Sequence, residues 1–267
     1  MDGSKKAKEL NSLGCCATMD VLGEDISSLE EATSAKEECL RVLDAIEAGK
    51  LDANLSLKLS QIGLRIDKEH CYQNVREVID KAKRVHNFVR IDMEDSTCTE
   101  DTLDIYRRLR KEYKNVGAVI QAYLKRSRED VKRLIDVGIA HLRICKGIYD
   151  ESPEIAFKDR EEIRESYMEL VRMILESGSY VGIATHDKVL VDRSLEILKS
   201  MNVPKSRYEF QMLLGVTEKL RNELVSQGHR LRVYVPYGEQ WYGYSVRRLK
   251  ENPKIAGHII KNIFVRG

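Results

Sequence analysis

The chain has 267 residues, of which 42% are hydrophobic and 33% charged, and its formal net charge is only +2. This near balance of charge provides no overall field for nucleic acid, so no nucleic-acid partner is expected. No stretch approaches the ~20 consecutive apolar residues of a membrane span, and Met1 to Leu13 lack the apolar core of a signal peptide. We expect a cytoplasmic protein.

The cysteines are dispersed along the chain, at Cys15, Cys16, Cys39, Cys71, Cys98 and Cys145. They form no CxxC pair of the kind that zinc sites and dithiol centres use. We therefore predict free, buried thiols and no metal site.

Apolar segments with strand character alternate with charged, amphipathic segments. The predicted strands are Cys16–Leu22, Leu55–Ser60, Phe88–Met93, Ala118–Tyr123, Leu142–Lys146, Val181–Thr185, Glu209–Leu213 and Arg232–Val235. Helices are predicted at Glu69–Val85, Thr102–Tyr113, Glu129–Val137, Ile163–Leu175 and Val189–Met201, where apolar residues recur every three or four positions. This alternation predicts an α/β fold with a parallel sheet. Because no Pro/Gly/Ser-rich linker divides the chain, we expect a single domain, 1–267.

A βα series of this kind can close as a (β/α)8 TIM barrel or lie open as a doubly wound sheet, and periodicity alone does not separate the two. The sequence contains neither GxGxxG after a strand nor GxxxxGK[ST], which are the usual signs of an open nucleotide-binding sheet. Eight βα units need roughly 250 residues, which this chain provides. We predict the barrel.

The two faces of each predicted strand differ, because successive side chains point to opposite sides. In Leu55–Ser60, for example, leucines occupy one face, and Ser56, Lys58 and Ser60 occupy the other. Helices cover the outside of a barrel, so the polar face should point inward. The charged residues placed inside in this way are Lys58, Arg90, Asp92, Glu94, Arg143, Glu209 and Arg232.

Burying such groups unpaired costs several kcal/mol each, so they must pair with one another or meet a polar ligand. Arg90, Glu209 and Arg232 lie early in their strands, and we expect them to form a self-paired network at the closed end. Lys58, Asp92, Gln121 and Arg143 lie nearer the carboxyl ends of the strands, where barrel active sites form, and we predict functional roles for them.

Several short segments, in matching order from Asp20 to Pro253, resemble the proline dehydrogenase family. They include Leu57–Ser60, Arg90–Asp95, Arg143–Tyr149, Ala184–Asp187 and, most specifically, Tyr242–Pro253 with the sequence YGYSVRRLKENP. The resemblance implies oxidation of L-proline to Δ1-pyrroline-5-carboxylate by hydride transfer from C5 to N5 of FAD. It also implies a last helix over the carboxyl-terminal mouth of the barrel. A quinone would be the final electron acceptor, with contact to the inner face of the membrane, and no protein partner is inferred.

The resemblance implies that Arg247 and Arg248 clamp the substrate carboxylate, which suits the planar fork of arginine. Lys58 is implied as a third positive partner, and Glu24 as the residue that closes the site by pairing with Arg247. Leu213, Tyr234 and Tyr244 would surround the proline ring. Alternatives remain open: core packing for the last three residues, a surface position for Glu24, and a solvated basic helix face for the arginines.

On the cofactor side, the resemblance places Arg143 beside flavin N5 and identifies Asp92 as an active-site aspartate. It implies further FAD contacts from Met93, Gln121, Lys146, Gly147, Ile148, Thr185, His186 and Glu251. The sequence departs from the family pattern at Ile148, where alanine is usual, and at Asp187, where asparagine is usual. Little chain precedes the first predicted strand.

Two other functions are compatible with the residues. The first is a Schiff-base aldolase on the same barrel, with Lys58 or Lys146 as the nucleophile. The second is a flavin-binding module that has the fold but no turnover.

Overall fold

A computed structural model describes residues 3–21, 23 and 26–237. Its strands form a closed, parallel barrel in which each strand pairs with the next and β8 pairs with β1. They are β1 (Cys16–Val21), β2 (Ala53–Leu57), β3 (Val89–Ile91), β4 (Val116–Gln121), β5 (His141–Cys145), β6 (Tyr180–Ala184), β7 (Tyr208–Leu213) and β8 (Leu231–Tyr237). The barrel prediction is confirmed, and the open sheet is excluded.

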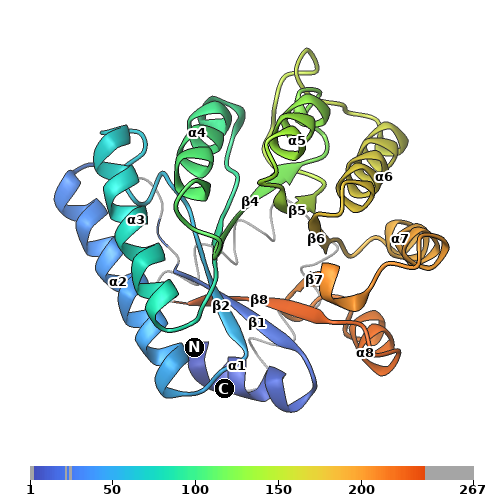
Figure 1. The fold of residues 1–267 in the computed structure, drawn as a ribbon, viewed down its shortest axis with the longest axis horizontal. Coiled ribbons are helices and arrows are strands. Elements are labelled where there is room, and N and C mark those ends of the chain that lie inside the picture. The colour runs from blue at the N-terminus through green and yellow to red at the C-terminus, as the bar shows by residue number, and fades with distance from the viewer. Residues whose placement is uncertain (1–2, 22, 24–25, 238–267) are drawn as a thin grey trace.

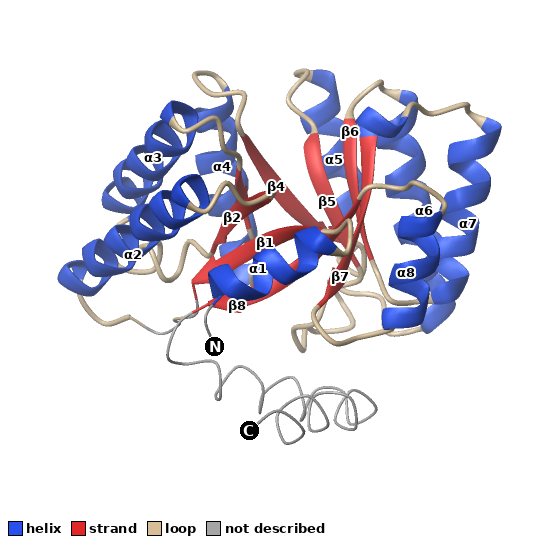
Figure 2. Ribbon diagram, turned by 90° about the horizontal axis from the view of Figure 1, so that it is seen from below, coloured by secondary structure: helices blue, strands red, loops and turns tan. Residues whose placement is uncertain are grey.

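Helices surround the strands as a ring (Figure 1) and flank the barrel on both sides in the perpendicular view (Figure 2). They are α1 (Gly3–Ser12), α2 (Leu29–Ala48), α3 (Lys68–Arg84), α4 (Thr99–Arg110), α5 (Ser127–Asp136), α6 (Arg160–Glu176), α7 (Lys188–Ser200) and α8 (Glu218–Ser226), with short 3-10 turns η1 (Ser96–Cys98) and η2 (Lys205–Arg207). Across these described residues, no helix combines the length and the apolarity that a bilayer crossing requires.

Helix α1 occupies the short stretch of chain that precedes the first strand. It packs against β1 and β8, between α8 and α2 in the ring (Figure 1). Its buried residues are Gly3, Ala7 and Leu10. In a regular barrel the helix that follows β8 would cover these strands. An element from before β1 therefore covers the seam where the barrel closes.

Both faces of the strands are buried, as the face comparison predicted. The outer face packs under the helices through residues such as Leu55, Ile91 and Leu142, none of which is exposed to solvent. The inner face carries polar residues that are equally buried, including Ser56 and Arg90. The described cysteines are free and buried, except Cys145, which is partly exposed.

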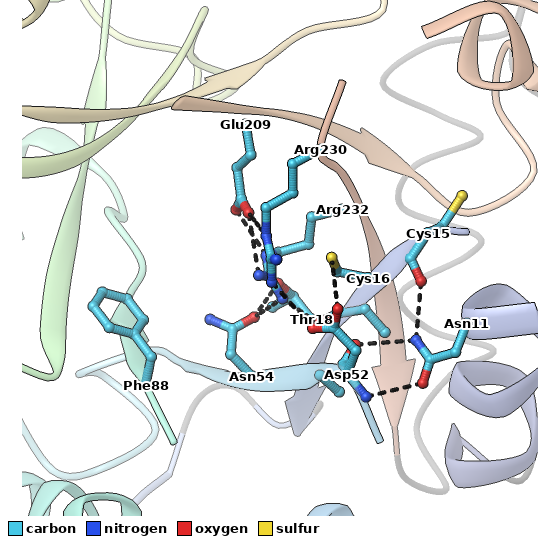
Figure 3. A network of polar contacts seen from close by, with 12 residues as sticks. Asn11, Cys15, Cys16, Thr18, Asp52, Asn54, Phe88, Glu209, Arg230 and Arg232 are labelled. Atoms are coloured by element: carbon cyan, nitrogen blue, oxygen red, sulfur yellow. Dashed lines mark hydrogen bonds and ion pairs between the residues drawn. The ribbon is translucent and has the colours of Figure 1, made fainter. Parts of the chain in front are cut away.

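A polar network occupies the lumen near the amino ends of the strands (Figure 3). Arg232 donates to both carboxylate oxygens of Glu209, at 2.7 and 3.1 Å, and Arg230 adds a bond of 3.2 Å. A further Arg232 nitrogen donates to Asn54 Oδ1 and to the Ala17 carbonyl oxygen, at 2.9 and 2.6 Å. Although burial raises the pKa of Glu209, the arginines lower it to about 2. The predicted self-paired network at the closed end is confirmed for Glu209 and Arg232.

Arg90 is also held at the closed end, but by carbonyl groups. Its Nη1 donates to the carbonyl oxygens of Ala118 and His141 at 3.0 and 2.8 Å. Its guanidinium carbon lies 5.0 Å from the centre of the Phe88 ring, a cation–π contact. Burial and the nearby Arg143 lower the pKa of Arg90 to about 10. Arg90 therefore serves the structure of the closed end, but through carbonyl groups and not through the predicted self-paired charge network.

Candidate active site

The mouth of the barrel, at the carboxyl ends of the strands, holds a first carboxylate–cation pair between Asp20 and Lys58. Lys58 follows β2, and its Nζ lies 2.7 Å from Asp20 Oδ2 in β1. The hydroxyl of Tyr234, in β8, donates to the same oxygen. The Asp20 carboxylate thus brings together Lys58 and Tyr234, which are both predicted substrate-binding residues.

The Asp20 side chain is completely buried. Its second oxygen, Oδ1, has no hydrogen-bond partner within residues 3–21, 23 and 26–237. Burial raises the pKa of this carboxyl; Lys58 opposes the shift and Asp92 adds to it. Most buried polar atoms in proteins are paired, so an unpaired oxygen beside predicted substrate-binding residues indicates a functional site.

A second pair joins Asp92, which follows β3, to Arg143 in β5. Arg143 Nη2 donates to Asp92 Oδ1 at 2.8 Å, and the Ser56 hydroxyl donates to the same oxygen. The side chains of Arg143 and Asp92 are 12% and 10% exposed, so both are largely shielded from water. Shielding strengthens their electrostatic interaction. The two residues predicted to be catalytic are therefore in direct contact.

Two predicted flavin contacts are Met93, which directly follows Asp92 after β3, and Gln121, the last residue of β4. Met93 and Gln121 are both buried. Gln121 Nε2 donates to the backbone oxygen of Glu94 at 2.8 Å, and Glu94 accepts from both the backbone and the hydroxyl of Ser60. Burial raises the pKa of Glu94. These bonds fix Gln121 at the carboxyl end of β4.

Lys146, Gly147 and Ile148 form the loop that follows β5. Gly147 has a φ of +108°, and a Cβ atom at this position would lie 2.1 Å from a ring carbon of Tyr123. Only glycine fits, because both the backbone conformation and the close approach exclude a side chain. Ile148, in the same loop, is 42% exposed.

Thr185 and His186 follow β6. His186 Nε2 accepts a 2.8 Å bond from the backbone N–H of Leu213, so its Nδ1 carries the hydrogen of the neutral ring. Thr185 Oγ1 accepts from the Asp187 backbone N–H at 3.1 Å. The contact between His186 and Leu213 brings together a predicted cofactor residue and a predicted substrate residue.

The remaining predicted site residues are Glu24, Tyr244, Arg247, Arg248 and Glu251. They lie outside the described residues, as does the predicted last helix over the mouth. Asp20, by contrast, was missed as a site residue. The sequence pattern that could have identified it was present, because polar Thr18 and Asp20 alternate with apolar Ala17, Met19 and Val21 as in the other strands.

A sequence model of the proline dehydrogenase family matches residues 3–260. Among curated proteins, proline dehydrogenase 1 of Bacillus subtilis subsp. natto is 41% identical over 259 residues, which cover 97% of this chain and 85% of the relative. The proline dehydrogenase of Deinococcus radiodurans is 34% identical, and the alignment covers 94% of this chain and 82% of that protein.

A crystal structure of proline utilization A (PutA) from Bdellovibrio bacteriovorus, inactivated by N-propargylglycine, superposes with a TM-score of 0.87 at 26% identity. The match covers 92% of this chain and 31% of that longer one. A PutA structure from Bradyrhizobium japonicum has a TM-score of 0.78 at 22% identity, covers 87% of this chain and 28% of its own, and supports the fold alone. Together, the family model and the curated relatives show that this chain belongs to the proline dehydrogenase family.

Proposed function

We propose that this chain oxidises L-proline to Δ1-pyrroline-5-carboxylate with FAD as cofactor and a quinone as electron acceptor. Family membership supports the reaction. The observation that carries it is the pair of shielded carboxylate–cation contacts, Asp20–Lys58 and Asp92–Arg143, at the end of the barrel where active sites form. With its quinone, the protein would work in the cytoplasm at the inner face of the membrane.

Lys58 is proposed to bind the carboxylate of proline. Its ammonium is held by Asp20 in a largely buried position, so it need not be ordered when the substrate arrives. Arg247 and Arg248 are proposed to complete the carboxylate clamp, with Glu24 closing the site. Tyr234, Tyr244 and Leu213 would pack around the ring. A rigid ring fixed at one end presents C5 in a defined place, and such positioning is a large part of catalysis.

The chemistry of the donors around β4, β5 and β6 fits FAD. Arg143 and Lys146 supply positive charge, His186 supplies an N–H, and Gln121 and Thr185 are polar residues at the ends of β4 and β6. We propose that these residues hold the cofactor together with Met93, Gly147, Ile148 and Glu251. When bound, FAD would supply at N5 the acceptor for the hydride that leaves C5 of proline. Arg143 would stabilise negative charge near N5, while Asp92 fixes the guanidinium.

The amine of proline must be neutral to release hydride, because a protonated nitrogen has no lone pair to support the forming C=N bond. We therefore expect the rate of flavin reduction by proline to rise with pH. A flat or falling profile would count against this scheme.

The aldolase alternative is disfavoured by the ion pairs. A Schiff-base lysine needs an amine that is available to attack a carbonyl, whereas the Nζ atoms of Lys58 and Lys146 lie 2.7 and 2.5 Å from the carboxylates of Asp20 and Asp187. Each amine is thus engaged by a carboxylate. Borohydride trapping of a carbonyl substrate on either lysine would reverse this conclusion.

The test is to mix the flavin-loaded protein anaerobically with L-proline and follow the flavin absorbance. Bleaching is the expected result, whereas a yellow protein that proline does not bleach would indicate the non-catalytic flavin module. Arg247→Met and Arg248→Met should each raise the proline concentration for half-maximal reduction at least about tenfold without loss of flavin. Arg133→Met, at an exposed position on α5, is the matched control. If both clamp variants behave like the parent, the substrate assignment is wrong.

A further inference from the structure

Asp187, one of the residues at which this sequence departs from the family pattern, pairs with positive side chains from two other parts of the chain. Its Oδ2 lies 2.5 Å from Lys146 Nζ in the loop after β5. Arg164, in α6, donates to both carboxylate oxygens at 2.9 Å. The Asp187 side chain is only 6% exposed. One buried carboxylate thus joins the β5–α6 loop, helix α6 and the β6–α7 loop.

The same carboxylate also begins helix α7. Its Oδ1 accepts from the backbone N–H of Val189 at 3.2 Å, which is a helix N-cap. Its own N–H donates to Thr185, a predicted cofactor residue. Burial raises the pKa of Asp187, but Lys146 and Arg164 lower it to about 2, so the carboxylate is charged throughout the physiological range.

We infer that Asp187 is a positioning residue of the flavin site. By holding Lys146 against α6 and α7, it orders the lysine ammonium before the phosphates of FAD bind. The inference rests on the proposed function, since it presumes that the chain binds FAD. A free lysine has many rotamers, and binding must then order it at a cost in affinity. We expect this ordering to change FAD affinity about tenfold.

Asp187→Asn is the most informative substitution. Asparagine keeps the size of the side chain and can still cap α7, but it carries no charge to hold Lys146. Asp187→Ser is a second uncharged cap of different shape, and it keeps the test usable if Asp187→Asn fails to fold. Asp192→Asn is the matched control. Asp192 lies on the same helix and pairs with Lys188 in solvent, with side chains 50% and 70% exposed.

The dissociation constants of FAD and of riboflavin, which lacks the phosphates, are measured by titration calorimetry on flavin-free protein. Asp187→Asn should bind FAD about tenfold more weakly and change riboflavin affinity less than about twofold. In a Lys146→Met background, Asp187→Asn should change FAD affinity less than about twofold, because its effect acts through Lys146. Asp192→Asn should bind both flavins like the parent.

The inference is overturned if Asp187→Asn binds FAD like the parent, or if its effect adds fully to that of Lys146→Met, since additivity indicates a general structural defect. A parent protein that binds no FAD would instead refute the proposed function. The two failures are therefore distinguishable.

Discussion

Glu209 offers a direct test of how the closed end of the barrel is stabilised. In Glu209→Gln the carboxylate charge is lost, while the buried Arg232 keeps its bonds of 2.6 and 2.9 Å to Ala17 and Asn54. Removing one partner of a buried ion pair costs about 3–5 kcal/mol. The pKa of Glu209, about 2, gives a second way to obtain this free-energy cost. Compared with ~4.3 for an ordinary glutamate, it corresponds to about 3 kcal/mol at neutral pH.

The assay is urea unfolding followed by circular dichroism at pH 7. Glu209→Gln should lower the free energy of unfolding by about 3 kcal/mol, which for this chain length lowers Tm by about 6–12 °C. Because the pKa of Glu209 is depressed in the folded state, its contribution is complete above pH ~4.3 and is lost as the pH falls toward 2. The difference between parent and variant should therefore shrink over that range.

Glu129→Gln is the control, because Glu129 pairs with Arg133 on the surface of α5 with both side chains more than half exposed. Such pairs contribute about 0–1 kcal/mol. If Glu209→Gln costs no more than this control, or if the difference is independent of pH down to 2, the reasoning about the closed end is wrong.

Two further predictions concern the mouth. Asp20→Asn removes the charge that holds Lys58, so KM for proline should rise about tenfold while kcat changes less than about threefold; steady-state kinetics measure both, and an unchanged KM would contradict the assigned role. Gly147→Ala places a Cβ against the ring of Tyr123 and should cost about 1–3 kcal/mol in urea unfolding. It should also weaken FAD binding. Gly138 also has a positive φ, +70°, but a Cβ there would meet nothing within 4 Å, so a larger loss for Gly138→Ala would refute the packing argument.

Helices α1, α2 and α8 were not among the predicted helices, and in two of them the periodicity of buried residues is weak. Helix α1 buries only Gly3, Ala7 and Leu10, and α8 buries only Arg221 and Leu224, which is too few positions for a clear period. Helix α2 buries six residues at suitable spacing, so a signal was present there. The carboxyl ends of β2 and β3 were also predicted too late, since Lys58 and Asp92 follow the strands instead of lying within them.

The amino-acid sequence by itself determined the βα alternation, the polar inner face of the strands and the family resemblance, because each depends on residues close together in the chain. Only the tertiary structure decided which charges meet. Asp20 and Lys58 are 38 residues apart, Asp92 and Arg143 are 51 apart, and Asp20 and Tyr234 are 214 apart. Their contacts depend on the register of neighbouring strands and on the closure of β8 against β1. Register and closure are set by the packing of the whole barrel, which no local pattern contains.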